Sequence, residues 1–366
     1  MITGYATPEG TARFAKKNSV AENHFRLFEG LTLSSIGVGT YLGNPDNDTD
    51  VLVKEAIKKS VLHGINVIDT AINYRSQKAE RSVGKAVLEL IEEGKSKREE
   101  LFISSKNGYI TNDGDVKEDF WQNIHNTLVR PGIIRSEDIS SGYHCMTIPY
   151  LENQLKQSLK NLNMDCIDLI YLHNAAEGQL QDITKEEFMK KIGMCFEFYE
   201  AQRKAGAIRY YGMATWDCFR VPKDHPQHIM LSDIMKLARE AGGDEHGLKF
   251  IQLPYNMYLD QALVMKNQIA NGKDSSILEA AINFGVGAFA SVPLMQAKLL
   301  QPNVLPEFGG LKPAHRALQF VRSTPGIIAP LVGHKTITHV DENVELVKVS
   351  PLSNEAFSEL VSKLTA

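Results

Sequence analysis

The sequence predicts an α/β fold, a single-domain (β/α)8 barrel of the TIM type, and three observations support this prediction. Short apolar runs rich in β-branched residues alternate with longer amphipathic stretches along the chain. Eight such runs occur, which is the number that one barrel requires. Each run is almost continuously apolar, as is typical of parallel strands buried on both faces. We therefore expect one domain that spans residues 1–366.

The eight runs define where the strands of this barrel should lie. A barrel of this type routinely exceeds roughly 200 residues as one unit, so the length of the chain is compatible with a single barrel. The stretches between the runs are long enough to hold a helix after each strand. The expected strands are Ile36–Thr40, Ile65–Asp69, Leu101–Lys106, Ile167–Leu172, Ala207–Met213, Lys249–Leu253, Val286–Ser291 and Ile327–Val332.

The segments between the strands show helical periodicity. In VLVKEAIKKSVLHG the apolar residues recur on one face, and Gly64 follows at a position typical of a helix end. In LENQLKQSLKNLN the leucines recur every three or four residues. Both patterns predict helices that pack one apolar face against the sheet.

A closed barrel fits the sequence better than an open, doubly wound sheet. An open sheet usually carries the glycine-rich turn GxGxxG after its first strand. Gly37 and Gly39 begin this pattern, but Leu42 occupies the position of the third glycine and Gly43 comes one residue late. We interpret the two glycines as tight backbone at a strand end.

Two regions depart from a minimal barrel. Residues 1–35 form an N-terminal extension before the first strand, and we expect them to cover one end of the barrel. Residues 107–148 form a long insertion after the third strand, and connections of this length are usually functional or flexible. Within the insertion, Phe120, Trp121, Ile124 and Leu128 have helical spacing and predict a short packed helix.

Composition narrows the function classes. The formal net charge of −4 gives no electrostatic footprint for nucleic acid. No apolar run approaches the roughly 20 residues that cross a bilayer, and the N-terminus lacks the apolar core of a secretory signal. The four cysteines are scattered without a CxxC pair, which favours the reducing cytoplasm over a disulfide-bonded setting.

Four polar residues lie at or just beyond the ends of three successive strands. Asp69 ends INVID and Tyr74 follows it, Lys106 ends LFISSK, and His173 ends IDLIYLH. The carboxyl ends of barrel strands open onto one face, so these side chains should converge there. Taken alone, each residue also has a structural explanation. Asp69 fits a helix cap or an ion-pair partner, and Tyr74 fits a packed aromatic residue. Lys106 fits a strand-end lysine, and His173 fits a core histidine. Their joint placement at the ends of three successive strands favours a catalytic site over four separate structural roles.

These residue types suit the reduction of a carbonyl group, which needs hydride at carbon and a proton at oxygen. Tyr74 can supply the proton, although an ordinary phenol with a pKa of about 10 is a weak acid at neutral pH. We expect the nearby Lys106 ammonium to lower that pKa, with Asp69 holding the lysine charged and oriented. His173 can polarise the carbonyl oxygen or assist the proton transfer.

At this point the sequence resembles the aldo-keto reductase family. The matching stretches are IGVGTYLG, VIDTAINY followed by AERSVGKAV, ISSK, LKQSLKNLNMDCIDLIYLHN and VGHKTITHVDENV. The resemblance implies that Asp69, Tyr74, Lys106 and His173 form the family's catalytic tetrad, with Tyr74 as the general acid. It also implies an NADPH cofactor, in preference to NADH, bound without a Rossmann domain, and a small-molecule carbonyl substrate.

The resemblance further implies that the adenosine end of the cofactor lies after the eighth strand, in the segment that begins at Gly333. Glu342 and Asn343 should contact adenine, and Lys335 is a candidate for the 2′-phosphate. His339 stands where many NADPH-preferring members carry arginine, whose planar fork is lost here. The same segment predicts a helix capped by Thr338 with Asp341 three residues later. A helix start of this kind binds phosphate readily.

Other family positions concern the nicotinamide and the substrate. Gln252 matches the glutamine that holds the carboxamide, and Thr215 keeps a hydroxyl for the same group although Ala214 replaces the usual serine. Phe289 is a candidate for the missing stacking ring. Tyr41, Trp216 and the aromatic residues of the insertion are candidates for the wall of the substrate pocket.

Two other functions remain open from the sequence. Lys106 at a strand end also suits a Schiff-base aldolase. Relatives of the reductases serve as cofactor-sensing binding subunits, so slow or absent turnover is the other alternative. A metal site is not expected, because His225 and His228 form an HxxH pair with no evident third ligand.

Overall fold

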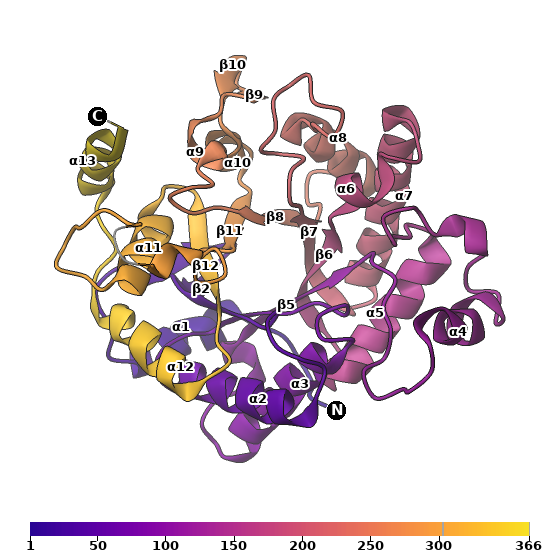
Figure 1. Ribbon diagram of the computed structural model, residues 1–366, viewed down its shortest axis with the longest axis horizontal. Helices are drawn as coiled ribbons and strands as arrows, with labels where there is room; N and C mark the ends of the chain where they lie inside the picture. The colour runs from indigo at the N-terminus through magenta and orange to yellow at the C-terminus, as the bar shows by residue number, and fades with distance from the viewer. Residues whose placement is uncertain (302–303, 366) are drawn as a thin grey trace.

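The structure, a computed structural model, describes residues 1–301 and 304–365. Eight parallel strands form a closed barrel in the order β11-β12-β3-β4-β5-β6-β7-β8 (Figure 1), which confirms the predicted fold class. All eight expected strands are present, with ends that differ by a few residues. They are β3 (Gly37–Gly39), β4 (Val67–Asp69), β5 (Phe102–Asn107), β6 (Ile167–His173), β7 (Ile208–Ala214), β8 (Leu248–Pro254), β11 (Gly287–Ser291) and β12 (Ile327–Gly333).

Helices surround the barrel and bury its outer face (Figure 1). Local sequence explains where several of them begin and end. Thr184 and Glu187 form a capping box at the start of α7, and Ser276 and Glu279 do the same for α10. Gly64 follows α2 with a φ of +92°, as predicted for a helix end. The helices are α2 (Asn47–Leu62), α3 (Lys78–Glu92), α5 (Ile148–Leu162), α6 (Ala175–Gln179), α7 (Lys185–Lys204), α8 (Leu231–Gly242), α9 (Gln261–Val264), α10 (Ile277–Phe284), α11 (Pro313–Ser323), α12 (Ile337–Val344) and α13 (Asn354–Thr365).

The N-terminal segment closes one end of the barrel. It contains α1 (Pro8–Lys17) and a hairpin of β1 (Phe25–Phe28) and β2 (Leu31–Ser34). Leu31 and Leu33 belong to the same buried cluster as Phe102 and Phe250, which lie in the first halves of their strands. The hairpin therefore plugs the amino end of the barrel and leaves the carboxyl end of the strands for the site.

Side chains of the two neighbouring strands pack closely against the glycine at the start of β3. A Cβ atom on Gly37 would lie 2.8 Å from Leu331 Cδ2 and 3.0 Å from Val67 Cγ1 on the two neighbouring strands. A larger residue at position 37 would therefore require the Leu331 and Val67 side chains to shift. Gly37 thus lies at a tightly packed position of the strand, where the close neighbours are side chains and not backbone.

The long insertion is folded and packed. It contains α4 (Phe120–Ile124), which continues into a π-helical turn (His125–Val129), and this confirms the predicted short helix. Ile110, Ile124 and Leu128 are buried within the main core.

A small hairpin of β9 (Gln268–Ala270) and β10 (Lys273–Ser275) lies outside the barrel. No helix in residues 1–301 or 304–365 is long and apolar enough to cross a membrane.

The start of α12 differs from the prediction. Thr336, not Thr338, is the N-cap, and its Oγ1 accepts a hydrogen bond from the backbone N–H of His339. Thr336 has an extended backbone while Thr338 already lies inside the helix, so the predicted box of Thr338 and Asp341 is wrong. Asp341 instead forms an ion pair with Lys59 of α2.

Candidate active site

Strand register brings the predicted catalytic residues to one end of the barrel. Asp69 ends β4, Lys106 is the penultimate residue of β5, and His173 ends β6. Asp69 pairs in register with Ser104, and His173 pairs with Ala214 of β7. Lys106 lies two residues beyond Ser104 and pairs with Tyr171, and His173 lies two residues beyond Tyr171, so all three side chains come from the carboxyl ends of neighbouring strands.

Asp69 is the centre of a buried hydrogen-bond network. Its Oδ2 accepts a hydrogen bond from Lys106 Nζ at 2.6 Å. Its Oδ1 accepts from Ser104 Oγ at 2.8 Å and from Gln252 Nε2 at 2.9 Å. The last bond spans the barrel interior between strands that are far apart in the sequence. Three donors therefore fix the position of the carboxylate.

Lys106 is completely buried beside Tyr74. Its ammonium also donates to the Thr70 carbonyl at 2.8 Å and lies 4.5 Å from the centre of the Tyr74 ring. Burial lowers the pKa of Lys106, and the ion pair with Asp69 opposes that shift. The lysine is thus held behind the phenol, with its charge neutralised by a carboxylate.

The pKa of Tyr74 differs from the prediction. Burial, followed by the charge of Asp69 and the nearby phenols of Tyr41 and Tyr109, raises the pKa of Tyr74 well above its usual value. The expected lowering by Lys106 is wrong for this structure, because Asp69 neutralises the ammonium and desolvation disfavours the phenolate. At neutral pH the phenol therefore keeps its proton.

His173 faces the Tyr74 ring across the mouth of the barrel. The two ring centres lie 5.9 Å apart at an interplanar angle of 75°. Burial, with smaller contributions from the charges of Lys106 and His144, lowers the pKa of His173 well below its usual value. Its Nδ1 is buried and has no hydrogen-bond partner among the residues described. His173 is therefore a neutral imidazole at the wall of the cavity, and a neutral ring can donate one hydrogen bond and accept another.

These groups open onto a cavity of about 600 Å³. Asp69, Tyr74 and His173 line it, whereas Lys106 lies behind them. A volume of this size is typical of a small-molecule or cofactor site. The other aromatic residues of its wall are Tyr41, Tyr109 and Trp216.

Most of the predicted cofactor residues line the same cavity. These are Thr215, Gln252, Gly333, His339, Glu342 and Asn343. Lys335 lies beside it: its Cδ would be 3.5 Å from a Cβ placed on Gly43. The Thr215 hydroxyl, however, donates to Glu177 Oε1 at 2.8 Å. In this structure that hydroxyl is therefore not free to donate to a carboxamide.

Asn343 is presented to the cavity by a histidine that the sequence did not single out as a site residue. Asn343 Nδ2 donates to His334 Nε2 at 3.1 Å, and His334 Nδ1 contacts Ser60 Oγ at 3.0 Å. Burial lowers the pKa of His334 to about 4, so the ring is neutral. The Oδ1 atom of Asn343 is buried and has no partner within the described parts of the chain.

Sequence reasoning also missed a second buried carboxylate near Lys106. Glu80 of α3 accepts from Ser105 Oγ at 2.6 Å and from Asn161 Nδ2 at 2.8 Å. Ser104 and Ser105 point to opposite sides of β5, so each serine serves a different acid. Adjacent residues of a strand face opposite sides, so the sequence ISSK indicated that Ser104 and Ser105 have different surroundings. It could not show that Glu80 of α3 is the partner of Ser105.

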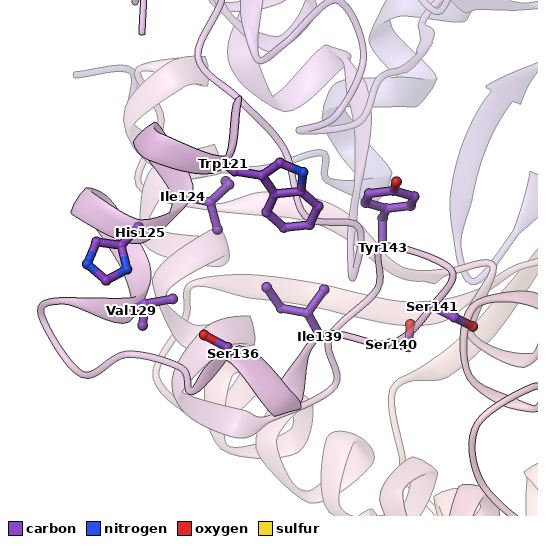
Figure 2. Close-up of a pocket in the computed structure, with 9 residues that line it drawn as sticks. All are labelled: Trp121, Ile124, His125, Val129, Ser136, Ile139, Ser140, Ser141 and Tyr143. Atoms are coloured by element: carbon purple, nitrogen blue, oxygen red, sulfur yellow. The ribbon is translucent and has the colours of Figure 1, made fainter. Parts of the chain in front are cut away.

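The aromatic residues of the insertion divide between two sites. Tyr109 lines the main cavity, with its ring centre 5.1 Å from that of His173. Trp121 and Tyr143 instead stack on each other beside a second hollow of about 530 Å³ within the insertion (Figure 2).

Phe289, the candidate stacking ring, is buried against Phe102 and Phe250 inside the barrel, so that expectation is wrong.

The HxxH pair has a structural explanation. His228 is buried, and its Nε2 hydrogen-bonds the Asn267 carbonyl at 2.8 Å. Over the two described ranges, no group of three or more His, Cys, Asp or Glu side chains is placed to hold a metal ion. All four cysteines are buried as free thiols.

Comparison with known proteins identifies the family of the chain. Residues 35–307 match the model of the Aldo/keto reductase family. "Uncharacterized oxidoreductase YqkF" of Bacillus subtilis (strain 168) is 22% identical over 333 residues, covering 91% of this chain and 93% of that protein. "Aldo-keto reductase family 1 member C2" of Homo sapiens is 30% identical over 201 residues, covering 52% of this chain and 50% of that protein.

Solved structures show the same fold. The holo form of aldo-keto reductase AKR11C1 from Bacillus halodurans has a TM-score of 0.62 at 19% identity, covering 94% of this chain and 96% of that chain. An aldo/keto reductase from Klebsiella pneumoniae in complex with NADP and acetate has a TM-score of 0.60 at 20% identity, with the same coverage of both chains. The family model extends over most of the chain. The protein is therefore a member of the aldo/keto reductase family and an oxidoreductase.

Proposed function

We propose that this protein is an NADPH-dependent oxidoreductase that reduces an aldehyde or ketone, or oxidises the corresponding alcohol, with Tyr74 as the general acid and base. One observation carries the proposal. A protonated Tyr74 phenol, with the Lys106–Asp69 ion pair behind it, faces a neutral His173 at the mouth of a cavity large enough for a cofactor and a small substrate.

The side chains divide the reaction between them. NADPH, when bound, supplies the hydride that adds to the carbonyl carbon. His173 polarises the carbonyl oxygen through a hydrogen bond, and Tyr74 gives that oxygen its proton as negative charge develops there. Lys106, 4.5 Å from the centre of the phenol ring, stabilises the phenolate that remains. Because burial raises the pKa of Tyr74, proton transfer should accompany the growth of charge on the substrate oxygen rather than precede it.

The residues present fit a pyridine nucleotide. Glu342 and Asn343, near the end of α12, line the cavity where adenine is expected, and Asn343 Oδ1 has no partner in the described parts of the chain. Gln252 uses its Nε2 on Asp69, and its Oε1 is left to accept from a carboxamide. Lys335 is exposed beside the cavity and is the proposed partner of the 2′-phosphate, with His339 nearby. The Klebsiella pneumoniae relatives solved with NADP or NADPH support the choice of nucleotide.

Titration with NADPH and NADH, read by protein fluorescence, tests cofactor binding first. A panel of aldehydes and ketones, followed at the nicotinamide absorbance band, then tests turnover, with Tyr74→Phe as the inactive control. We expect saturable NADPH binding and carbonyl-dependent oxidation. Binding without turnover on any carbonyl would favour the cofactor-sensing alternative, and indifference to both nucleotides would refute the proposal.

Two contacts argue against a Schiff-base aldolase. Lys106 Nζ is held by Asp69 and the Thr70 carbonyl, and the side chain is fully buried behind the cavity wall. A nucleophilic amine needs access to the substrate carbonyl and must be unprotonated. Borohydride treatment with a carbonyl substrate should therefore leave Lys106 unmodified.

We also propose the cytoplasm as the setting, since four free buried thiols suit a reducing compartment.

A further inference from the structure

The turn that follows Tyr74 has an unusual backbone. Arg75, Ser76 and Gln77 have φ angles of +48°, +52° and +73°, so three consecutive residues other than glycine adopt the left-handed conformation. Each such residue costs free energy, because its Cβ approaches the backbone carbonyl oxygen. A run of this kind persists only where surrounding contacts over-determine it. The turn connects Tyr74 directly to α3, so its conformation sets the direction of the phenol.

Side chains of α2 and α3 hold one side of this turn. The Arg75 guanidinium donates to Asp50 Oδ1 and to Ser82 Oγ, each at 2.8 Å. Lys78 Nζ lies 3.0 Å from Asp50 Oδ2. Both cationic side chains are almost fully buried, so neither exchanges these partners freely for water.

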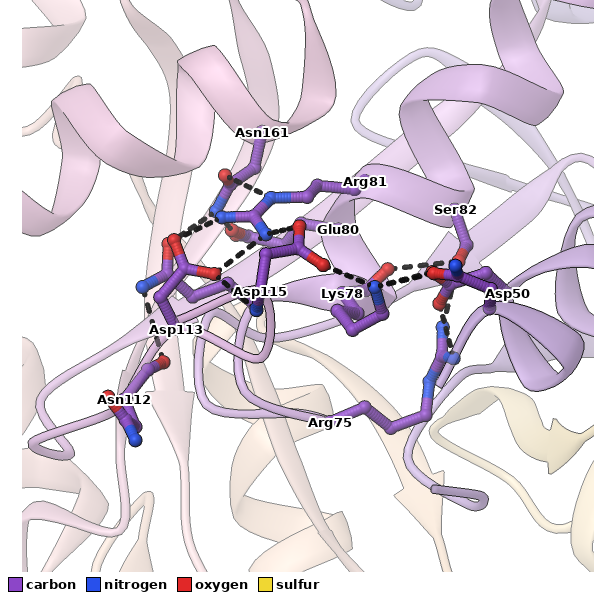
Figure 3. Close-up of polar contacts among 12 residues, drawn as sticks. Asp50, Arg75, Lys78, Glu80, Arg81, Ser82, Asn112, Asp113, Asp115 and Asn161 are labelled. Atoms are coloured by element: carbon purple, nitrogen blue, oxygen red, sulfur yellow. Dashed lines mark hydrogen bonds and ion pairs between the residues drawn. The ribbon is translucent and has the colours of Figure 1, made fainter. Parts of the chain in front are cut away.

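The insertion holds the other side through residues 112–115, which we name the acidic loop (Figure 3). Its Gly114 N–H donates to the Ser76 carbonyl at 2.8 Å, and Gln77 Nε2 donates to the Asn112 carbonyl at 3.2 Å. These two bonds tie the loop directly to left-handed residues of the turn. They also connect the insertion after β5 with the segment after β4.

Ion pairs reinforce this connection. Asp115 Oδ1 lies 2.6 Å from Lys78 Nζ, so Lys78 bridges the acidic loop and Asp50 of α2. Arg81 binds both oxygens of Asp113, at 2.8 and 2.7 Å, and also contacts Asp115 at 2.6 Å (Figure 3). The two-point contact between Arg81 and Asp113 fixes orientation as well as distance. Hydrogen bonds from Arg81 and Lys78 lower the pKa values of Asp113 and Asp115 respectively, so the ion pairs persist at neutral pH.

We propose that the acidic loop is a positioning element for the reaction: it clamps the left-handed turn at residues 75–77 and thereby aims the Tyr74 phenol at the substrate oxygen. Asp113 and Asp115 act through Arg81, Lys78 and the turn, and they do not touch the cavity contents in this role. The inference rests on the proposed function of Tyr74. It gives the insertion a task in catalysis that is separate from substrate contact.

The double variant Asp113→Asn/Asp115→Asn tests the clamp while it preserves side-chain shape. We expect kcat to fall about tenfold to a hundredfold, because a misplacement of about 1 Å has effects of this size. The KM and the NADPH Kd should change little, since the cofactor half of the cavity is untouched. Glu118→Gln/Glu137→Gln is the matched control, with the same change in charge on exposed residues of the same insertion, and its kcat should stay at the wild-type value.

Hydrogen exchange gives a readout that needs neither cofactor nor turnover. In the cofactor-free double variant, the amides of residues 75–79 should exchange faster than in the control, while those of β6 stay protected. Adding Ser76→Gly should restore part of the lost kcat, because glycine adopts the left-handed conformation without a clamp. A merely structural loop would lower thermal stability without this rescue.

The outcomes separate the clamp from the proposed function. Equal kcat and equal exchange in the double variant and its control would overturn the clamp and leave the role of Tyr74 intact. If wild-type protein reduces no carbonyl, the exchange experiment still decides whether the loop holds the turn. Should the double variant fail to fold, Asp115→Asn replaces it, since this carboxylate is 57% exposed and only its contacts with Lys78 and Arg81 would be weakened.

Discussion

The two halves of the cavity are built on different principles. In the catalytic half, at the ends of β4, β5 and β6, the charged groups satisfy one another: Asp69 accepts three hydrogen bonds, and Lys106 is buried against it. In the cofactor half, around β12 and α12, some polar groups have no protein partner within the described residues. Asn343 Oδ1 has no partner, and Lys335 forms no ion pair within residues 1–301 and 304–365.

The difference matches the tasks proposed for the two halves. A proton donor needs a fixed position, and mutual hydrogen bonds fix it before any ligand arrives. A nucleotide site needs unused donors and acceptors, because the ligand supplies the missing partners. Backbone strain does not follow this division: residues 75–77 beside Tyr74 have positive φ, and so do Val292, Met295, Gln296 and Ala297 in the segment after β11. Four predictions can break or sharpen this comparison.

Tyr74→Phe should have the largest effect and should act on the catalytic half alone. Loss of the positioned acid should lower kcat by about 100-fold to 10,000-fold, while the Kd of NADPH stays nearly unchanged. Steady-state rates and fluorescence titration of the same preparation measure both quantities. Turnover near the wild-type rate would rule Tyr74 out as the proton donor.

Asp69→Asn should destabilise the protein, because it leaves the buried Lys106 ammonium without its carboxylate. Breaking a buried ion pair from one side costs about 3–5 kcal/mol, and chemical denaturation measures it. The double variant Asp69→Asn/Lys106→Met should recover much of this loss while remaining inactive. If Asp69→Asn alone is as stable as wild type, the pair does not carry the charge balance described above.

Lowering the pH should decrease the unfolding free energy of the protein through one buried histidine in each half of the cavity. These are His144 in the catalytic half and His334 in the cofactor half. Burial lowers the pKa of His144, which donates from Nε2 to the His173 carbonyl, and that of His334 to about 4. A folded pKa below the unfolded value of about 6.5 means that the unfolded chain binds more protons between these values, so stability falls as pH drops through that window. From pH 7 to pH 5 each histidine should account for about 2 kcal/mol of lost unfolding free energy.

Urea denaturation at both pH values checks this dependence. His144→Asn and His334→Asn should each lose about 2 kcal/mol less than wild type on acidification, whatever their stability at pH 7. An identical loss in wild type and in either variant would mean that the histidine in question is not buried in its neutral form.

Lys335→Ala should have the smallest effect and should act on the cofactor half alone. An exposed ion pair contributes up to about 1 kcal/mol, so the Kd of NADPH should rise about fivefold while that of NADH stays constant. Lys312→Ala, which removes an exposed lysine paired with Glu345, is the control. Equal weakening of both nucleotides would contradict the contact with the 2′-phosphate.

The barrel and the placement of the four candidate catalytic residues at its mouth could be read from the sequence. Alternating apolar runs identify parallel strands, and the carboxyl ends of such strands meet on one face. Asp69, Lys106 and His173 could therefore be brought together without coordinates, because strand ends in a closed barrel are neighbours whatever their separation along the chain. Tyr74 follows Asp69 by five residues and could be placed at the same mouth, and the family resemblance implied its role as the general acid.

Only the tertiary structure decided the remaining features, because they depend on contacts between distant segments. The bond from Gln252 to Asp69 joins residues 183 positions apart, and the Thr215 hydroxyl turns to Glu177, which is 38 positions away. The raised pKa of Tyr74 required the balance between burial and a neutralised lysine, which no pattern of letters contains. Periodicity records which face of a segment is apolar; it does not record which polar atoms meet when those faces pack.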